Sequence, residues 1–342
     1  MTTPKEHSIR IEPHGRTLRA REDQSVLEVA LAAGLNLPHS CRSGHCASCR
    51  ARLVFGEIHY PNGRTAGLTA EEAASGYVLL CQARPRSDLR IEARLIANAS
   101  EAEIKTLPCR IARMERLAPD VMQVFLRLPA VEPLQFKAGQ YLDVLVDGGK
   151  RRSFSIASPP HDSGEIELHV RHVPGGGFTS TLFEKLRAGA LLRIEGPIGQ
   201  FIYRDSTAPA VLIAGGTGFA PIKSILRHAM ERGSERPLHL YWGARHAADL
   251  YEEKAVLEWV RQHPNLTFTA VLSEASPGEA EAGHRRTGWV HEAVLADHPD
   301  LTGFDVYAAG PPAMVEAVRA TFPARGLAEE RLHFDSFDYA PR

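Results

Sequence analysis

The sequence has no long apolar run and almost no net charge. No stretch approaches the roughly 18 consecutive apolar residues of a membrane-spanning helix, and the polar N-terminal segment MTTPKEHSIRIEPHG lacks an apolar signal core. We therefore expect a cytoplasmic protein. The 40 Lys and Arg residues against 41 Asp and Glu give a formal net charge of −1, which argues against bulk binding to nucleic acid.

Several familiar catalytic motifs are absent as well. The chain contains no G-x-S-x-G, no H-E-x-x-H and no Walker A loop, and its 16 His residues have no metal-ligand spacing. There is also no internal repeat and no low-complexity tract. The chemistry of this chain must therefore depend on other motifs.

Cysteine is scarce, with five in the chain, but four of the five have an informative spacing. Cys41, Cys46 and Cys49 form C-x4-C-x2-C in the run CRSGHCASC, and Cys81 follows in LLCQARP. This is the plant-type ligand pattern of a 2Fe–2S cluster. Gly44 lies inside the loop, where the lack of a Cβ allows backbone N–H groups to approach the sulfurs. The pattern predicts a one-electron carrier in the first hundred residues.

Other interpretations of the cysteines are weaker. Structural zinc usually uses paired C-x2-C units, of which only one is present, and a Rieske centre would need C-x-H and C-x2-H units. His39 and His45 flank the ligands and are interpreted as surface residues. Cys109, in KTLPCRIARM, is interpreted as a buried strand residue, because a disulfide framework is not expected in a chain of this size and setting.

The length of 342 residues favours two or three domains. Residues 1–98 have a β-grasp pattern: two short strands over 7–20, a helix ending near Gly34, the strand pair RARLVFGEIHY, a short helix capped by Thr69 and the strand RIEARLI. The polar stretch 97–108 is expected to be a linker. The N-terminal domain is thus predicted to be a small α+β ferredoxin domain.

The remaining chain changes character near residue 206. Residues 105–205 are mainly strand-like with one helical segment, TSTLFEKLRAG, which predicts an antiparallel β-barrel with a capping helix. Residues 206–342 alternate apolar strands with helices, which predicts a doubly wound α/β domain with a parallel sheet.

Two motifs in the barrel region point to a flavin. In RSFS, Arg152 can pair with a diphosphate and Ser155 can hydrogen-bond the flavin ring edge. Alone this tetrapeptide is weak, but the glycine-rich turn PGGGFTS follows about twenty residues later and opens a helix that can face an anion. A flexible hairpin loop is the alternative for that turn. Together the motifs favour FAD over FMN. The predicted FAD-binding residues are Arg152, Ser153, Phe154, Ser155, Gly176, Thr179 and Ser180.

A third group of motifs points to a nicotinamide dinucleotide. AGGTGFAP is a strand–turn–helix phosphate loop, although it is not the G-x-G-x-x-G fingerprint, and YAAGPPAM ends another parallel strand, where ligands of open α/β sheets bind. Arg245 could hold a ribose 2′-phosphate or be a solvated strand end. The sequence indicates no acidic residue at that strand end, so NADH and NADPH are not distinguished. The predicted nucleotide-binding residues are Gly215, Gly216, Thr217, Gly218, Pro221, Arg245, Gly310 and Pro311.

With these motifs in place, the chain resembles the three-domain reductases of the ferredoxin–NADP⁺ reductase superfamily. The resemblance covers nearly the whole chain through CRSGHCASC, FKAGQY, RSFS, GPIGQF, GGTGFAP and YAAGPPAM, in the expected order. Within the superfamily it is most similar to the CDP-6-deoxy-glucoseen reductases and to oxygenase reductase components. Two positions depart from the usual family pattern. Phe154 replaces a Tyr in the flavin motif, and Ala309 replaces the Cys of C-G-x-P beside the hydride-transfer site, which puts the rate of hydride transfer in doubt.

The resemblance implies an NAD(P)H-dependent electron-transfer reductase. It implies that electrons pass from NADH or NADPH through FAD, positioned by Ser155 without an acid–base residue, to the 2Fe–2S cluster and then to a partner. That partner would be an oxygenase or hydroxylase component or a deoxyhexulose dehydrase, with the reductase monomeric outside the complex. Two alternatives are a self-sufficient reductase of ferric chelates, flavins or quinones and a redox sensor without turnover.

The N-terminal hundred residues carry a small positive charge, with 13 Lys and Arg against 10 Asp and Glu. Five arginines lie close in sequence to the cysteine ligands and could form a basic rim that docks an acidic partner; ordinary solvated surface is an equal interpretation. These arginines are Arg42, Arg50, Arg52, Arg84 and Arg86.

Overall fold

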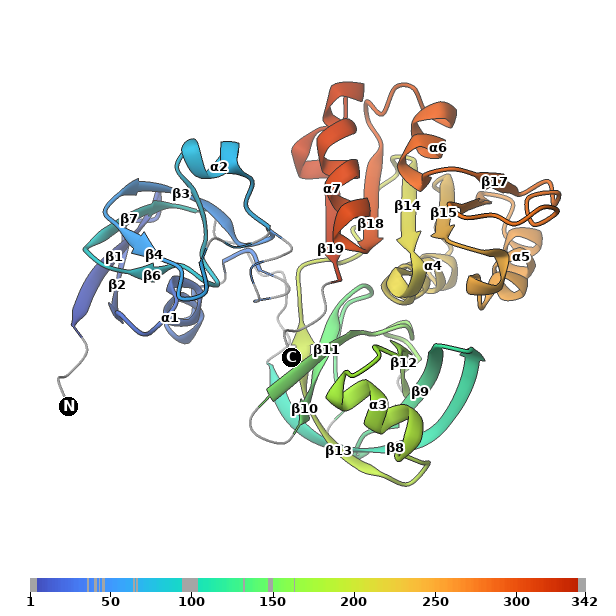
Figure 1. Cartoon of the computed structure of the whole chain (residues 1–342), viewed down its shortest axis with the longest axis horizontal. Coiled ribbons are helices and arrows are strands. Elements are labelled where there is room, and N and C mark those ends of the chain that lie inside the picture. The colour runs from blue at the N-terminus through green and yellow to red at the C-terminus, as the bar shows by residue number, and fades with distance from the viewer. Residues whose placement is uncertain are drawn as a thin grey trace. The chain divides into compact units, whose positions relative to one another are not determined.

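The computed structural model describes residues 5–35, 37–39, 42, 44, 47–63, 65, 67–93, 104–131, 133–146, 150–162 and 164–337. The chain divides into two compact units, Met1–Glu101 and Ala102–Arg342, and Figure 1 shows the elements of each. In the described part of the chain, every helix is too short or too polar to cross a membrane.

The N-terminal unit is a β-grasp domain built on a five-stranded sheet. The sheet order is β2-β1-β7-β3-β5, with β1 parallel to β7 and the other pairs antiparallel. Alternate residues of β1, including Ile9 and Ile11, enter the core, as expected for a half-buried strand. The elements are β1 (Glu6–Glu12), β2 (Arg16–Arg21), α1 (Val26–Ala32), β3 (Arg50–Phe55), β4 (Ile58–His59), α2 (Ala70–Ala74), β5 (Tyr77–Leu79), β6 (Arg84–Pro85) and β7 (Leu89–Glu92).

Local sequence signals explain the helix ends of this unit. Thr69 forms a capping box with Glu72, as its position before α2 predicts, and Gly34 adopts φ +73 just beyond α1. The prediction that the two strands of RARLVFGEIHY pair with each other is wrong. β3 joins the main sheet and β4 pairs with β6, because Gly56, at φ +98, turns the chain between them.

The second unit begins with a closed antiparallel barrel. The strand order is β11-β10-β13-β8-β9-β12, and an isolated bridge between Ile156 and Leu168 joins the two ends of the sheet. Helix α3 contributes Leu182 to the core, which confirms the barrel with one helix. The elements are β8 (Lys105–Ala118), β9 (Val121–Arg127), β10 (Tyr141–Val146), β11 (Lys150–Ser155), β12 (Ile166–Arg171), α3 (Gly177–Glu184) and β13 (Leu191–Ile198).

The barrel begins inside the segment 97–108 that was expected to be a linker. Strand β8 begins at Lys105, so residues 105–108 belong to the barrel because they pair with β13. Cys109 lies in the same strand and is buried, as predicted. Burial raises the pKa of its thiol to about 12.

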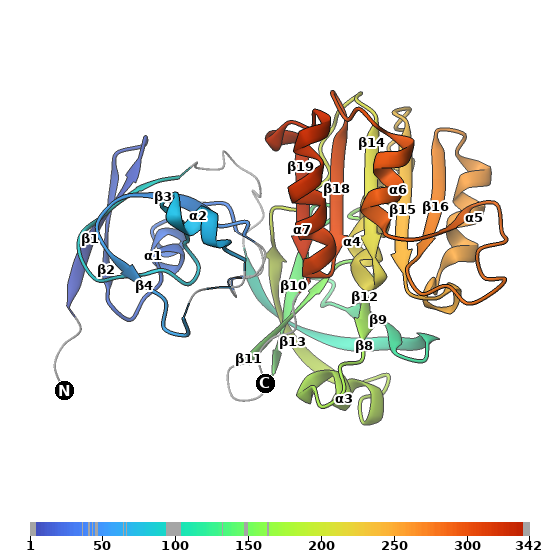
Figure 2. The ribbon, with the colours of Figure 1, turned by 45° about the horizontal axis from the view of Figure 1, so that its top comes forward.

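The rest of the second unit is a doubly wound domain with a six-stranded parallel sheet, as predicted. The order is β17-β16-β15-β14-β18-β19, and Figure 2 shows α6 and α7 on one face and α4 and α5 on the other. Strands β14 and β18 are buried throughout. The elements are β14 (Ala210–Gly215), η2 (Gly216–Gly218), α4 (Phe219–Glu231), β15 (Leu238–Ala244), η3 (Ala247–Asp249), α5 (Glu253–Gln262), β16 (Leu266–Leu272), β17 (Arg285–Thr287), α6 (Val290–Asp297), β18 (Asp305–Gly310), α7 (Pro312–Thr321), η4 (Pro323–Arg325), η5 (Glu329–Arg331) and β19 (Leu332–Ser336).

A histidine on β15 predicts how the stability of this domain depends on pH. The ring of His239 stacks on Tyr241 at 3.9 Å, and its Nδ1 lies 3.3 Å from Nε2 of His298. Burial and the His298 charge lower its pKa to about 4. The unfolded chain, with an ordinary His pKa near 6.5, binds the proton more strongly, so stability falls as pH drops from about 6.5 toward 4.

When the pH falls from roughly 7 to 5, protonation of His239 in the unfolded chain should by itself lower the free energy of unfolding by about 1 kcal/mol. This value allows for the partial exposure of the ring. Urea unfolding of the wild type and of His239→Gln at both pH values measures this contribution. The variant should lose stability less steeply on acidification, and equal slopes would contradict the assignment.

Candidate functional site

The described residues of the cysteine loop share an unusual backbone conformation. Arg42, Gly44 and Ala47 all adopt left-handed backbone, with φ of 53°, 85° and 56°. The amide of Gln82 donates to the Arg42 carbonyl at 2.8 Å. A Cβ on Gly44 would lie 2.8 Å from a methyl group of Thr65 and 2.9 Å from the Gln82 side chain, so this position needs glycine.

Two of the four predicted ligands are described, and the fold brings them together. Cys49 and Cys81 are both buried, and the N–H of Leu80 donates to the Cys49 carbonyl at 3.1 Å. Burial, and then the charges of Cys49 and Cys81, raise the pKa of Tyr60, whose hydroxyl accepts from Leu79 N–H at 3.0 Å. Cys41 and Cys46 lie outside the described residues. The two buried cysteines and the left-handed backbone at the described loop positions fit a 2Fe–2S cluster.

The prediction that His39 is a surface residue is wrong. Its side chain is buried rather than on the surface, with Nδ1 2.8 Å from the carbonyl oxygen of Leu37. Burial lowers the pKa of His39, which favours a neutral ring. His45 lies outside the described residues.

The basic rim is smaller than the sequence suggests. Arg50 forms an ion pair with Glu72 and its guanidinium lies 5.0 Å from the centre of the Tyr77 ring. Arg52 and Arg86 are exposed. Arg50 is therefore a structural residue, whereas the exposed arginines are available to a partner.

The two predicted flavin motifs lie side by side in the barrel. The rings of Phe154, on β11, and Phe178, on α3, are 5.7 Å apart, and Ser155 is buried at the end of β11. The hydroxyl of Thr179 accepts from Val173 N–H at 3.1 Å.

Other hydroxyls of these motifs also make contacts within the protein. Ser153 donates to Asp143 at 2.6 Å, and Ser180 Oγ lies 3.3 Å from Nε2 of His172. Arg152 donates to the carbonyl oxygen of Arg151 at 2.8 Å. A Cβ on Gly176 would lie 2.9 Å from the Val173 carbonyl oxygen, so the glycine turn forms a tight cradle at the start of α3. This cradle fits a phosphate group.

The predicted nucleotide loop lies where the carboxyl ends of β14 and β18 meet. A Cβ on Gly218 would overlap the Ala309 carbonyl oxygen, and one on Gly310 would lie 2.9 Å from the Cα of Gly215. A Cβ on Gly215 would lie 2.6 Å from the Pro311 ring. These glycines permit a close approach of backbone, which fits a dinucleotide. Thr217 lies between them in η2, and Pro221 follows in the first turn of α4.

Arg245 is exposed at the end of β15, the strand next to β14. The fold also brings an acidic residue there, which the sequence did not suggest. Glu274 donates its N–H to the Arg245 carbonyl at 3.0 Å, and its carboxylate lies 4.0 Å from His246. The end of this strand therefore carries charges of both signs.

Sequence reasoning missed Arg171, the last residue of β12. A Cβ on Gly216 would lie 3.3 Å from its Nη2, so the barrel arginine rests against the nucleotide loop. Its Nε is 3.4 Å from a carboxylate oxygen of Asp120, but Nε and Nη2 are buried without a hydrogen-bond partner among the described residues. A guanidinium beside the loop whose N–H groups lack hydrogen-bond partners among the described residues fits a bound pyrophosphate.

Three features together are typical of an iron–sulfur flavoprotein reductase: an N-terminal unit with buried Cys49 and Cys81 (the cysteine unit), a barrel with a phosphate cradle, and a nucleotide loop. Three family models match: a 2Fe-2S iron-sulfur cluster binding domain over residues 9–86, an oxidoreductase FAD-binding domain over 108–203 and an oxidoreductase NAD-binding domain over 212–320. The chain belongs to the three-domain reductases of the ferredoxin–NADP⁺ reductase superfamily, and its cofactors are a 2Fe–2S cluster, FAD and a nicotinamide nucleotide.

Relatives match over nearly the full length. The CDP-6-deoxy-L-threo-D-glycero-4-hexulose-3-dehydrase reductase of Yersinia pestis is 38% identical, covering 96% of this chain and 98% of the relative. The terephthalate 1,2-dioxygenase reductase component 1 of Comamonas sp. is 37% identical, covering 98% of both. The crystal structure of Amycolatopsis cytochrome P450 reductase GcoB aligns with a TM-score of 0.76 at 35% identity, covering 97% and 98% of the two chains.

Proposed function

We propose that this reductase delivers electrons from NADH or NADPH, one at a time, to a separate enzyme through its cysteine unit. The observation that carries the proposal is the contact between Arg171 of the barrel and Gly216 of the nucleotide loop. The contact lies in the second compact unit of the chain, whereas the buried Cys49 and Cys81 lie in the first. The barrel that carries the flavin motifs therefore meets the nucleotide loop within one unit. The cysteines belong to the other unit, from which we propose that the electrons leave.

The chain's own residues bind and orient the three groups. When bound, a reduced nicotinamide supplies a hydride, FAD accepts two electrons and releases them singly, and a 2Fe–2S cluster carries one. In our proposal Arg152 and Ser155 hold the flavin, and the turn at Gly176 receives its phosphates. Arg171 pairs with the nucleotide pyrophosphate, while Gly218 allows the loop to approach it.

We infer that the electron acceptor is an oxygenase or hydroxylase component or a sugar dehydrase. Relatives of both kinds match from end to end, among them the dehydrase reductase of Yersinia pestis and the dioxygenase reductase of Comamonas sp.. A reductase of small acceptors would not need the cysteine unit, so we favour a protein partner. The monomeric state expected from the family resemblance stays a prediction.

An anaerobic titration tests the electron route. Adding NADH or NADPH to the protein loaded with FAD and cluster should bleach the flavin absorbance and then produce the paramagnetic signal of a reduced cluster. Flavin bleaching without that signal, even with excess nucleotide, would contradict a route through the cluster.

The exposed arginines predict a salt-sensitive docking step. Arg86→Glu should weaken coupled turnover with the partner enzyme by about tenfold at low ionic strength, and the difference should shrink as salt screens the surface charges. Coupled turnover over a salt series measures the effect. Arg19→Glu, an exposed change on the edge strand β2, is the matched control. Equal losses in both variants would remove the basic-rim hypothesis.

A further inference from the structure

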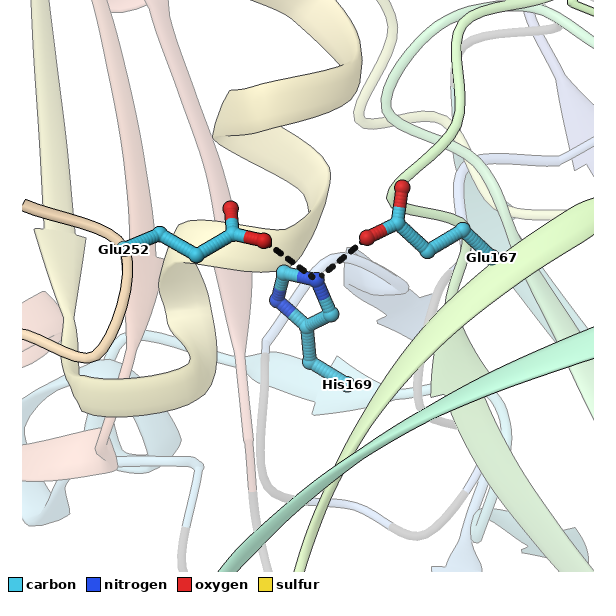
Figure 3. A group of neighbouring side chains, drawn as sticks. All are labelled: Glu167, His169 and Glu252. Carbon is cyan, nitrogen blue, oxygen red and sulfur yellow. Dashed lines mark hydrogen bonds and ion pairs between the residues drawn. The ribbon is translucent and has the colours of Figure 1, made fainter. Parts of the chain in front are cut away.

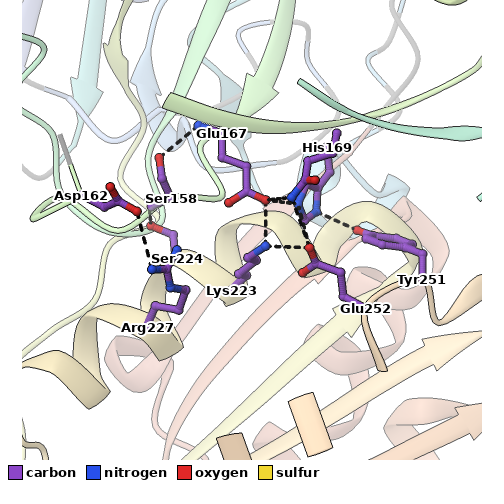
Figure 4. Close-up of polar contacts among 10 residues, drawn as sticks. Ser158, Asp162, Glu167, His169, Lys223, Ser224, Arg227, Tyr251 and Glu252 are labelled. Atoms are coloured by element: carbon purple, nitrogen blue, oxygen red, sulfur yellow. Dashed lines mark hydrogen bonds and ion pairs between the residues drawn. The ribbon is translucent and has the colours of Figure 1, made fainter. Parts of the chain in front are cut away.

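A buried cluster of charged side chains joins the barrel to the nucleotide-binding domain. Glu167 and His169 come from β12 of the barrel, whereas Lys223 lies on α4 and Glu252 directly precedes α5 (Figure 4). The ammonium of Lys223 lies 2.7 Å from one oxygen of Glu167 and 2.7 Å from one oxygen of Glu252. One cation therefore bridges two carboxylates that belong to different domains.

The environment of this cluster makes its charges strongly interacting. The side chains of His169, Glu167, Lys223 and Glu252 are 0%, 4%, 7% and 11% exposed. Burial penalises a charged Glu167, but the hydrogen bond with His169 and the Lys223 charge outweigh this and lower the pKa of Glu167. The carboxylate is therefore ionised, and its charge is compensated by His169 on its own strand and by Lys223 from the opposing domain.

A bound metal ion is a poorer explanation of the same residues. One ligand atom each from Glu167, His169 and Glu252 lie within 4.8 Å of one another (Figure 3), a spacing that would suit a cation. Lys223, however, already contacts both carboxylates, and a metal ion would have to displace it into a buried site. The ammonium therefore supplies the positive charge.

Further contacts along α4 follow the same boundary. Ser224 donates to the carbonyl oxygen of Ser158 at 2.8 Å, and Arg227 lies 3.6 Å from a carboxylate oxygen of Asp162. Both partners belong to the loop between β11 and β12 of the barrel. Helix α4 thus contacts the barrel through successive residues on one face, and Lys223 is the most buried charge among them.

The charged cluster is connected to the nucleotide loop by stacked rings. His169 stacks on Phe219 with 6.4 Å between ring centres, and Phe219 stacks on Trp242 at 3.9 Å. The indole N–H of Trp242 donates to the Gly216 carbonyl at 3.1 Å. Arg171, two residues beyond His169 on β12, rests on the same Gly216. A shift of α4 against β12 would therefore move the loop relative to the barrel.

We propose that Glu167, Lys223 and Glu252 form an interdomain latch, and that Lys223 is a positioning residue that fixes the nucleotide loop against the flavin-binding barrel. The inference rests on the proposed function, because the geometry it protects is that of nucleotide facing flavin. Without the ammonium, the two carboxylates would keep only His169 and the neutral amide of Gln123 between them. The Nε2 of His169 lies 2.9 Å from an oxygen of Glu167 and 3.8 Å from one of Glu252. The amide nitrogen of Gln123 lies 2.5 Å and 3.4 Å from the same oxygens. The repulsion between the carboxylates would then be less compensated in a poorly solvated site, which would favour separation of the domains.

The latch predicts a specific pattern among variants. Lys223→Met should slow flavin reduction at saturating NADH or NADPH by about 10–100-fold, because small misplacements of reacting groups have effects of this size. It should also increase amide hydrogen exchange in residues 166–171 and 219–226, measured without nucleotide. The double variant Lys223→Met/Glu252→Gln removes one of the opposing charges and should recover part of both the rate and the protection.

Glu253→Gln is the matched control, since Glu253 pairs with Arg285 at 2.8 Å inside the nucleotide-binding domain. It should leave exchange in 166–171 and the reduction rate unchanged.

A packing role for Lys223 predicts no recovery in the double variant, and that result would overturn the latch. Normal exchange and normal reduction in Lys223→Met would overturn it too. If Lys223→Met fails to fold, Lys223→Arg, which keeps the charge, should fold and retain protection; loss in both would overturn the charge-based argument. Wild-type protein that fails to reduce flavin would instead contradict the proposed function, while the exchange measurements would still test the latch.

Discussion

Replacing Cys81 with Ser should lower NAD(P)H-driven cytochrome c reduction by about 100-fold or more, because a hydroxyl is a poor substitute for the thiolate that the cluster requires. Reduction of ferricyanide, which can take electrons from the flavin, should be largely retained. The ratio of the two activities therefore reports the route through the cysteine unit. Iron content and visible absorbance of the purified variant establish that the cluster is lost.

The control for this experiment is Cys109→Ser. Cys109 is buried in β8, in the other unit of the chain, so its replacement should alter stability but leave the ratio of the two activities unchanged. Cytochrome c reduction at the wild-type rate in cluster-free Cys81→Ser would show that electrons leave from the flavin, and would favour the alternative of a reductase of small acceptors.

Gly218→Ala should abolish reduction by NADH and NADPH and destabilise the nucleotide-binding domain by about 3 kcal/mol or more. Gly218 has φ −59° and ψ −12°, so an alanine backbone is not strained there. The added Cβ would overlap the Ala309 carbonyl oxygen and lie 2.8 Å from the Cα of Gly310. Both neighbours are backbone of the adjacent strand and cannot rotate away. The loop must therefore separate from β18, which disrupts the nucleotide site.

Urea unfolding and nucleotide-dependent flavin reduction measure the two effects. Gly283→Ala is the control, because a Cβ there would meet no atom within 4 Å and its φ is not positive. That variant should behave as the wild type does. Retention of wild-type nucleotide reduction by Gly218→Ala would mean that the close approach of η2 to β18 is not needed for binding.

Sequence patterns predicted most of the fold because the relevant signals are local. The continuous apolar runs of β14 and β18 identify buried parallel strands, and the capping residue Thr69 lies next to the helix it starts. The short strand β17, only Arg285–Thr287, is exposed or half-buried and lacks an apolar run. It could not be distinguished from a loop, because its identity depends on pairing with β16.

Contacts across domain boundaries were not predictable from the sequence. Arg171 and Gly216 are 45 positions apart, while Glu167 and Lys223 are 56 positions apart. Gly216 lies in the predicted nucleotide loop, but its partner Arg171 and both members of the other pair lie outside every motif. A Lys inside an amphipathic helix is ordinarily assigned to the surface, yet Lys223 is buried because two carboxylates neutralise it. His39 was assigned to the surface because a polar residue beside a loop gives no sign in the sequence that the fold buries it.

The burial of Cys109 has a practical consequence for anyone handling this protein. With a thiol pKa of about 12, only about one molecule in 100,000 carries the reactive thiolate at neutral pH. Alkylating reagents should then ignore Cys109 in the native state. Because the other four cysteines are the predicted cluster ligands, any thiol that becomes titratable under native conditions would indicate cluster loss, and a simple colorimetric thiol count would serve as a quality measure for each preparation.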